Sequence, residues 1–495
     1  MWSDQLSGKR RERLAGRLRA VLPAPRPGSR GSKTPLRVPG PKAGPSPAQV
    51  AEELRDQPGF AWLDGGDSPG DSGGHRLYVR PLATLAVRGG RASVSGPGGR
   101  AAFAASGFDL LAAAFAAWGG AGAGATLVGY LGYELGGELE TLPAPPADDL
   151  RLPDLHLSLY DAVLRWDGRS WTLEATDAWS GIESSSDLTD PIIEGERLLA
   201  AARRRSDPEI PPGPLGRDSV VSRPNRGGFE AAVVRIVERI ASGEIFQMNL
   251  CRRLEAKVPA ARLWTLYRRL RAASPAEHGA FLDLGRKRAV LSISPERFLA
   301  VRDREVESRP IKGTRPRGAN PREDRALARE LLESEKDRAE LTMIVDVVRN
   351  DLGRVCATGS VEVTRHAELM SLPTLHHTVS TVRGRLRPDA GPVELLRAAF
   401  PPASITGAPK IQAMAAIAAE EERRRGPAMG ALGWISLGGD LDLAVAIRTA
   451  AAARGRVVYH AGCGIVADSD PELEFAESAA KARAFLAALG ARETG

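Results

Sequence analysis

Two kinds of hydrophobic pattern divide the chain. Residues 48–205 contain short runs in which apolar and polar positions alternate, such as RLYVRPLATLAV and LHLSLYDAVLRW, separated by glycine-rich turns. Alternation with a period of two is typical of half-buried β-strands, so this segment is predicted to be a sheet-rich subdomain. Residues 206–228 are rich in Pro, Gly and polar side chains, which indicates a surface linker. Helical and strand-like patterns interleave over residues 229–495.

The segment after the linker gives the sharper local predictions. Apolar residues recur at helical spacing from Phe229 to Ile240, and Gly243 marks the end of that helix. IFQMNLCRRLEAKV then alternates like a strand, which places Gln247 and Asn249 on one face. The apolar window LLAAAFAAWGGAGAGATLVGY is interrupted by glycines, so it predicts a short helix, a loop and a strand and not a membrane span.

Two predicted helices carry paired acidic residues. RALARELLESEKDRAELTMIVDVVRNDLGR is predicted to form one long helix ending near Gly353, with Asp337 and Glu340 three residues apart on one face. Such a pair beside an apolar stretch is costly unless a cation lies between the carboxylates. The alternative is an ordinary solvated helix face.

The C-terminal segment DSDPELEFAESAAKARAFLAALG repeats the same spacing. Asp470 is a good N-cap and Pro471 suits the first helical position, so the start of this helix is well marked. Glu474 and Glu477 are again three residues apart. Two helices of this kind can hold one hard cation, and oxygen-only ligands favour Mg²⁺ over zinc. The alternative is that the acids only stabilise the first turn of the helix.

Lys312 in SRPIKGTRPRG allows two interpretations from its surroundings alone. It is either a solvated cation, or an amine held on a rigid element among positive charges that lower its pKa and make it a nucleophile. In SISPERFL, Glu296 lies at an expected strand end beside apolar neighbours, where its pKa would be raised and it could donate a proton.

Two glycine-containing segments are further candidates for ligand binding. ITGAPK predicts a tight turn that leads into a helix at Pro409, where backbone N–H groups can face an anion. YHAGCGIVADSD predicts a strand that breaks at Gly462 and Gly464, where the missing side chains would let a ligand approach the backbone. Either segment can also be an ordinary turn.

Composition narrows the class of protein. The chain has 495 residues, 43% of them hydrophobic and 26% charged, which is ordinary for a globular protein. Much of its net charge of +7 comes from residues 1–47, a Pro-, Gly- and Arg-rich segment predicted to be a mostly disordered extension. That segment lacks the interleaved aromatic residues of a nucleic-acid-binding arm and the apolar core of a secretion signal. Three widely spaced cysteines favour a reducing compartment, the cytoplasm.

Several motifs together resemble one enzyme family. SPERF, PIKGTRPRG, EKDRAELTMIVDVVRNDLGR, SITGAPK, DLAVAIRTA and AGCGIVADSDPELEFAESAAKA, in this order, resemble the chorismate-utilising enzymes. These include anthranilate synthase, aminodeoxychorismate synthase component I, isochorismate synthase and salicylate synthase. FAWLDGG and VGYLGYEL resemble the family's N-terminal part more loosely. The resemblance implies a mixed α/β fold with two facing, antiparallel-rich sheets flanked by helices and an active site in the central cleft.

The resemblance also implies roles for particular residues. Glu340 and Glu477 are expected to bind Mg²⁺ directly, with Asp337 and Glu474 acting nearby or through water, and the metal is expected to hold the ring carboxylate of chorismate. The residues expected to line the substrate site are Thr314, His377, Thr406, Gly407, Arg448, Gly462, Gly464 and Lys481. The neighbouring His376 is expected to be incidental.

Lys312 and Glu296 are the expected catalytic residues. Anthranilate synthases have PIAGT where this chain has PIKGT, and ammonia attacks ring carbon 2 directly. In aminodeoxychorismate synthases the lysine is proposed to attack carbon 2, aided by the acid that matches Glu296, so that ammonia can add only at carbon 4. Isochorismate and salicylate synthases have a lysine base where this chain has Gln247, and a neutral glutamine cannot serve as that base.

The resemblance therefore favours an aminodeoxychorismate synthase component I, serving p-aminobenzoate and folate supply or an aromatic secondary pathway. Ammonia is expected from a separate glutamine amidotransferase, because no cysteine here lies in a nucleophile-elbow context. The alternatives are anthranilate synthase component I and an inactive scaffold that only binds a glutaminase. WLDGG replaces the family's tryptophan-binding LLES, so the resemblance does not extend to tryptophan inhibition.

Overall fold

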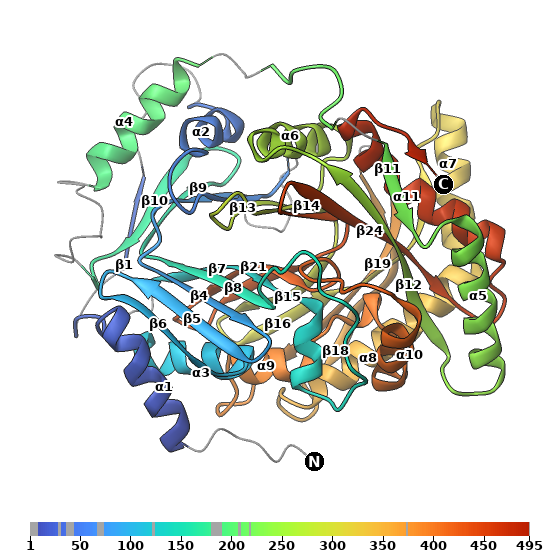
Figure 1. Cartoon of the computed structure of the whole chain (residues 1–495), viewed down its shortest axis with the longest axis horizontal. Coiled ribbons are helices and arrows are strands. Elements are labelled where there is room, and N and C mark those ends of the chain that lie inside the picture. The colour runs from blue at the N-terminus through green and yellow to red at the C-terminus, as the bar shows by residue number, and fades with distance from the viewer. Residues whose placement is uncertain are drawn as a thin grey trace.

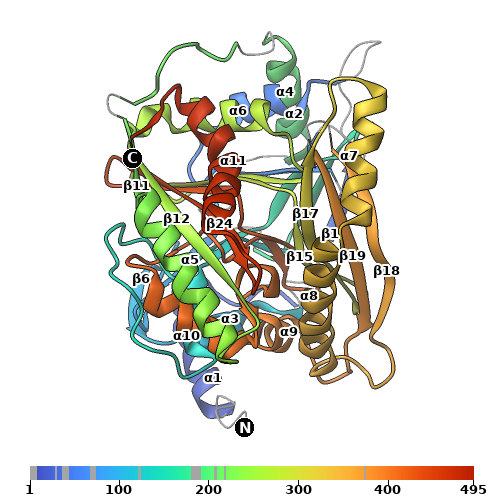
Figure 2. The ribbon, with the colours of Figure 1, turned by 90° about the vertical axis from the view of Figure 1, so that its right-hand side faces the viewer.

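The chain folds around two large β-sheets. The computed structural model describes residues 8–27, 31–35, 44–66, 74–120, 124–179, 191–205, 209–216, 219–372 and 375–494. In Figure 2, β12 (Gln247–Lys257) and β24 (Arg456–Ile465) lie on one side of the molecule, and β17 (Ile311–Pro316) and β19 (Leu375–Arg385) lie on the other. The expected class of two facing, antiparallel-rich sheets is confirmed.

Sheet A contains β12 and β24 and draws strands from the whole length of the chain. Its order is β1 (Gly31–Pro35), β10 (Trp171–Thr176), β9 (Ala162–Trp166), β3 (His75–Tyr78), β2 (Ala61–Asp64), β13 (His278–Asp283), β14 (Ala289–Ser294), β23 (Thr449–Ala453), β24, β12, β11 (Val220–Arg223) and β25 (Glu493–Thr494), with β20 (Gly407–Ala408) beside β12. Its described pairs are antiparallel except β11 with β25.

Sheet B contains β17 and β19. Its order is β17, β19, β16 (Glu305–Arg309), β15 (Arg297–Arg302), β22 (Leu441–Val445), β21 (Ala431–Ser436), β7 (Thr126–Leu131), β8 (Leu155–Tyr160), β4 (Ala83–Arg88), β5 (Arg91–Gly96) and β6 (Gly99–Ala104), with β18 (Glu362–Ser371) beside β19. Both sheets contain strands from each side of the predicted linker, so residues 48–205 and 229–495 build common sheets.

Helices cover the outer faces of both sheets (Figure 1). Those beside sheet A are α2 (Pro47–Leu54), α4 (Pro191–Arg203), α5 (Arg226–Ala241), α6 (Leu263–Ala273) and α11 (Pro471–Leu489). Those beside sheet B are α1 (Gly8–Val21), α3 (Gly107–Trp118), α7 (Pro321–Glu333), α8 (Glu335–Gly353) and α9 (Pro392–Ala399). Helix α10 (Lys410–Glu420) packs on β12, and short 3₁₀ turns occupy η2 (Tyr133–Glu138), η3 (Ala260–Arg262) and η4 (Ala403–Ile405).

The two sheets are joined by an apolar layer between them. Tyr78 and Leu282 of sheet A pack with Tyr130 and Trp434 of sheet B in one buried cluster. Burial of large aromatic side chains of this kind removes much apolar surface from water and dominates core energetics. The two sheets therefore form a fixed frame for the side chains between them.

Part of the N-terminal prediction is wrong. Residues 8–27 were expected to belong to a disordered extension, but α1 buries Leu14, Leu18 and Val21 in the core beside sheet B. The Leu22 carbonyl also accepts a hydrogen bond from the Trp118 indole. The basic residues of α1 lie between these apolar positions, and that helical spacing is what lets one face pack. Residues 1–7, 28–30 and 36–43 of the predicted extension lie outside the described residues.

Three further local predictions need correction. The predicted helix over 325–354 is two helices, because Ser334 has an extended ψ of 106° and its side chain caps α8 by accepting from the Asp337 N–H. The strand predicted to break at Gly462 and Gly464 is continuous, since β24 pairs with β12 through both glycines. The predicted linker over 206–228 includes a strand, β11, and the first residues of α5.

Other local predictions are confirmed. The helix from Phe229, the strand from Gln247, the α8 end at Gly353 and the α11 start at Asp470 and Pro471 all form as expected. The apolar glycine-interrupted window forms α3 and β7. No helix of the described residues has the length and hydropathy to cross a bilayer.

Candidate active site

Lys312 lies in the interior of the molecule. It is on β17, its side chain is 12% exposed, and its Nζ is 3.8 Å from Glu340 Oε2 of α8. A Cβ placed on Gly464 of β24 would lie 3.1 Å from the same Nζ. The amine is thus held between sheet B, α8 and sheet A, which contradicts the interpretation of Lys312 as a freely solvated cation.

The glycines of β24 make this approach possible. A Cβ at Gly464 would also lie 2.5 Å from Gln247 Nε2, and one at Gly462 would lie 2.5 Å from the Leu250 carbonyl oxygen. Gln247 is buried, and its Oε1 has no hydrogen-bond partner among the described residues. Any larger residue at position 464 would therefore displace the side chains of Gln247 and Lys312 from β24.

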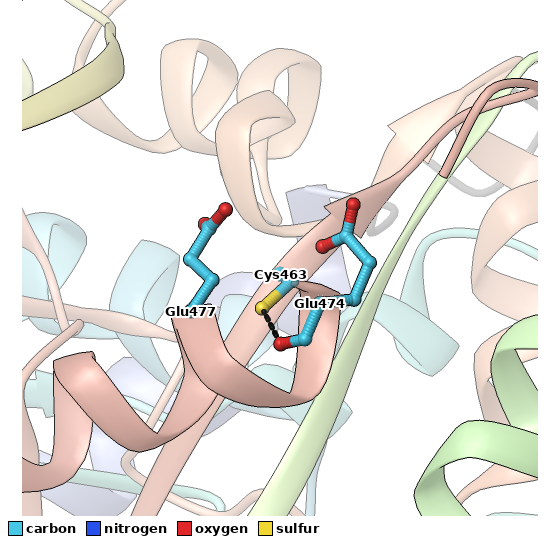
Figure 3. Close-up of side chains that lie close together, drawn as sticks. All are labelled: Cys463, Glu474 and Glu477. Carbon is cyan, nitrogen blue, oxygen red and sulfur yellow. Dashed lines mark hydrogen bonds between the residues drawn. The ribbon is translucent and has the colours of Figure 1, made fainter. Parts of the chain in front are cut away.

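Helix α11 presents two carboxylates and β24 a thiol in one group. Ligand atoms of Glu474, Glu477 and Cys463 lie within 4.8 Å of one another, and Figure 3 shows both carboxylates extending from α11 in the same direction. The Cys463 thiol donates to the Glu474 backbone carbonyl (3.1 Å), and burial raises its pKa well above the ordinary value. A protonated thiol is a poor metal ligand, so the two carboxylates are the useful donors.

The carboxylates differ in their immediate partners. Lys481 Nζ is 2.6 Å from Glu477 Oε1 and also donates to the Gly462 carbonyl (3.0 Å). This ammonium holds the pKa of Glu477 below its ordinary value, whereas burial raises the pKa values of Glu340 and Glu474.

Asp337 forms an ion pair with an arginine, and its charge also acts on Glu340. Its carboxylate is 3.3 Å from the Arg315 guanidinium, and its Cγ would lie 3.0 Å from a Cβ at Gly313. Neither Asp337 nor Glu340 belongs to the group of ligand atoms within 4.8 Å of one another, although Glu340 is close enough to Glu477 for the two charges to interact. Asp337 therefore lies beside Gly313 and Arg315 of β17, one turn before Glu340 on α8.

The residues present fit a hard divalent cation. Glu474 Oε2 is buried and has no hydrogen-bond partner among the described residues. An unpaired carboxylate oxygen in the interior is costly unless a cation binds it. Glu340, Glu474 and Glu477 offer only oxygen, the donor type that Mg²⁺ prefers.

Glu296 lies in a drier part of the site. It follows β14, is 3% exposed, and burial raises its pKa to about 7. The neighbouring Ser404 hydroxyl, the Lys312 ammonium and the Ile311 backbone N–H oppose that rise. A carboxyl group with this pKa is well suited to donate a proton near neutral pH, as the sequence predicted.

His377 connects Arg448 to the irregular part of β17 beside Lys312. Arg448 Nη2 is 3.4 Å from His377 Nε2, and Nδ1 is 3.2 Å from the Gly313 carbonyl and 2.9 Å from Thr314 Oγ1. Because a guanidinium can only donate, Nε2 must accept and Nδ1 carries the proton. Burial lowers the pKa of His377 to about 3, so the ring stays neutral and positions Gly313.

Thr406 and Gly407 have mainly structural contacts. The Thr406 hydroxyl is fully buried and donates to the Pro402 and Ala403 carbonyls. Gly407 has φ of 148°, and a Cβ there would lie 2.0 Å from the Gln247 carbonyl oxygen. Both residues hold the ITGAPK turn against β12, and the Thr406 hydroxyl is already bonded within the protein.

Sequence reasoning missed three side chains near the site. Lys336 Nζ is 3.7 Å from Glu474 Oε1, Ser469 donates to the same oxygen (2.7 Å), and Ser404 lies beside Glu296. Lys336 precedes Glu340 by four residues, a spacing that could have indicated it. His376, expected to be incidental, bonds Asp324 and Ser371.

Comparisons with known proteins show the family of the chain. A family model described as chorismate binding enzyme matches residues 62–487. The chain is 42% identical to aminodeoxychorismate synthase of Streptomyces griseus over 73% of its own length, and it spans only 50% of that relative. It is 40% identical to anthranilate synthase component 1 of Streptomyces coelicolor, with 73% of this chain and 72% of the relative covered.

A solved structure of an anthranilate synthase component I has a similar fold. The crystal structure of anthranilate synthase component I from Streptococcus pneumoniae superposes with a TM-score of 0.69 at 27% identity, covering 86% of this chain and 92% of the other. Relatives named for two different reactions are thus similar to this chain to nearly the same degree.

Proposed function

Because the chain belongs to the family of chorismate binding enzymes, we propose that it is component I of an aminodeoxychorismate synthase. In this role it combines chorismate with ammonia to give 4-amino-4-deoxychorismate and water. The position of Lys312 carries the proposal. Identities of 42% and 40% to relatives with different names do not separate the two aminations. A largely buried amine facing Glu340 and Gly464 favours amination at carbon 4, because it could occupy carbon 2 of the ring.

The first step forms a covalent link to the protein. Lys312, which pairs with Glu340 as an ammonium, first gives one proton to solvent. The amine then attacks carbon 2 of chorismate, the two ring double bonds shift, and the bond between carbon 4 and its hydroxyl oxygen breaks. Glu296 donates its proton to that oxygen, which leaves as water. The raised pKa of Glu296 supports this role, because the carboxyl group still holds a proton near pH 7.

The second step reverses the link. Ammonia attacks carbon 4, the double bonds shift back, and Lys312 leaves carbon 2 with the electron pair of the C–N bond. The new ammonium group at carbon 4 gives one proton to the Glu296 carboxylate, and the released Lys312 amine takes back a proton from solvent, so both residues return to their starting states. Gln247 carries no charge and cannot activate water in competition with ammonia.

Glu340, Glu474 and Glu477 would hold Mg²⁺ in this proposal, with Asp337 one turn before Glu340 on α8. The ion would supply positive charge for the ring carboxylate of the substrate. The unpartnered Oε2 of Glu474 and the absence of a deprotonated thiol support a hard cation. Arg448 and Lys481 are the cationic side chains proposed to bind substrate carboxylates, beside Gly462 and Gly464 of β24.

Ammonia would come from a separate glutamine amidotransferase. The three cysteines of the chain are buried and free, and none is a candidate glutaminase nucleophile. Buried free thiols also support a reducing compartment, the cytoplasm, where the product would serve p-aminobenzoate and folate synthesis or a related aromatic pathway.

Product analysis tests the proposal. The purified protein is incubated with chorismate, MgCl₂ and ammonium chloride at pH 8.5, and products are separated by liquid chromatography with mass detection. We expect 4-amino-4-deoxychorismate, which keeps its enolpyruvyl group, and no release of pyruvate. Fluorescent anthranilate together with pyruvate would overturn the assignment. No turnover at saturating ammonium would favour an inactive scaffold.

A further inference from the structure

The acidic residues of the site are each paired with a different lysine. The pairs are Glu340 with Lys312 (3.8 Å), Glu474 with Lys336 (3.7 Å) and Glu477 with Lys481 (2.6 Å). Three negative and three positive charges therefore balance within this cluster. A divalent cation that binds the carboxylates has to compete with these ammonium groups.

The three lysines are not equally fixed. Lys312 is 12% exposed and packed against Gly464, and Lys481 is 36% exposed and held by the Gly462 carbonyl. Lys336 is 44% exposed, and its ion-pair partner among the described residues is Glu474. It lies in the first turn of α8, so its side chain can move into solvent without disturbing either sheet.

Glu474 is the carboxylate most affected by Lys336. It is 4% exposed, and its Oε1 accepts from Ser469 and faces Lys336, while its Oε2 has no hydrogen-bond partner among the described residues. Lys336 also acts electrostatically on Glu340 and Glu477. The partly exposed Lys336 ammonium thus influences Glu340, Glu474 and Glu477 together.

We propose that Lys336 is the displaceable counter-ion of the metal site: it neutralises Glu474 in the metal-free protein and is expelled by the entering divalent cation. The inference rests on the proposed metal site and adds a determinant of its affinity. Lys336 stabilises the buried carboxylate before the metal arrives, and it weakens metal binding because its charge has the same sign as that of the ion. Lys312 and Lys481 stay in place for the substrate.

The test is a titration of the full-length protein with Mn²⁺, a spin-active substitute for Mg²⁺, with free Mn²⁺ measured by electron paramagnetic resonance. No substrate is present, so the readout is affinity and not turnover. Lys336→Met is expected to bind Mn²⁺ about tenfold more tightly, the effect of removing one positive charge a few ångströms from a divalent ion in a partly solvated site. Lys336→Arg keeps the charge and is expected to stay within about twofold of the parent protein.

Arg338→Met is the matched control, because it removes a positive charge from an exposed position on the same helix. It is expected to leave the affinity within about twofold of the parent. In a Glu474→Gln background, Lys336→Met should tighten binding by less than in the parent, because the carboxylate it neutralises is gone.

Three results of the Mn²⁺ titrations would overturn the proposal. Unchanged or weaker Mn²⁺ binding in Lys336→Met overturns the counter-ion role, and so does equal tightening in Arg338→Met. If the parent protein binds no Mn²⁺ at all, the metal site of the proposed function is itself wrong, and this inference falls with it. Circular dichroism of each variant excludes loss of fold as the cause.

Discussion

The two halves of the candidate site shift the pKa of a glutamate in opposite directions. On the α8 and α11 half, Glu477 is 52% exposed and the adjacent Lys481 lowers its pKa. On the other half, Glu296 is 3% exposed and burial raises its pKa to about 7. One glutamate is kept charged, and the other keeps a proton near neutral pH.

The difference shows how one cleft can bind an anion and also donate a proton. The α8 and α11 half collects carboxylates and lysines, which suits ion binding and charged substrate groups. The half around Glu296 and His377 is dry, and both side chains are predominantly uncharged there from above pH 3 to just below pH 7. Lys312 lies on the border, with Glu340 on one side and Glu296 close enough for their charges to interact.

Removal of the Lys312 side chain, which lies between the two halves, should have the largest effect on the rate of product formation. Lys312→Ala should lower the rate of 4-amino-4-deoxychorismate formation by at least about 10³-fold, because no other described amine is placed to occupy carbon 2. The rate is measured with ammonium chloride as the nitrogen source. Lys287→Ala, at an exposed turn, is the control and should keep the parent rate. Parent-like turnover in Lys312→Ala would show that Lys312 is not the nucleophile between the two halves.

The dry half is tested next by Glu296→Gln, which keeps the shape of the side chain but removes its proton. We expect the rate of chorismate consumption without ammonia to fall by about 10²-fold or more. In the parent protein this rate should decline above about pH 7, where Glu296 loses its proton. The decline should be absent in the variant, measured by rapid quench between pH 5.5 and 9. A decline that persists in Glu296→Gln would assign it to another group.

The same substitution should change how stability depends on pH. Between the ordinary pKa of 4.5 and about 7, folded Glu296 holds a proton that the unfolded chain has released. Its contribution to the free energy of unfolding is therefore complete below pH 4.5 and is lost as the pH rises towards 7. Glu296→Gln should gain stability relative to the parent from pH 5 to pH 8, as measured by urea unfolding. An unchanged difference across this range would argue against a buried, protonated Glu296.

The smallest expected effect concerns the start of α8. Ser334→Ala removes the side-chain cap from the Asp337 N–H and should lower the free energy of unfolding by about 1 kcal/mol. Because Lys336 and Glu340 follow directly, metal affinity should weaken more than in Asn320→Ala, which removes the cap of α7. Equal effects of the two variants on metal affinity would mean that the α8 cap has no special importance for the site.

Local signals in the sequence were sufficient for much of the fold. Asp470 followed by Pro471 marked the start of α11, and alternation from Gln247 marked β12, because both signals depend on neighbouring residues. The two paired acids and Lys312 were likewise recognisable from spacing and motif. The raised pKa of Glu296 followed from its apolar neighbours.

Other features depend on partners distant in the sequence. The continuity of β24 through Gly462 and Gly464 is imposed by pairing with β12, about 210 residues earlier, and by Gln247 and Lys312 filling the space above Gly464. Helix α1 is ordered because it packs against α3. Its basic composition suggested disorder and gave no sign of that packing. The single-helix prediction failed because the Ser334 cap outweighed a continuous helical propensity over 325–354.

The most direct test of the account is mass spectrometry of the protein after incubation with chorismate and MgCl₂ in the absence of ammonia. The account predicts a covalent adduct on the peptide that contains Lys312, with the mass of chorismate less one water, and its disappearance when ammonium is added. Formation of 4-amino-4-deoxychorismate under the same conditions plus ammonium, with no adduct at Lys312 at any time, would contradict it.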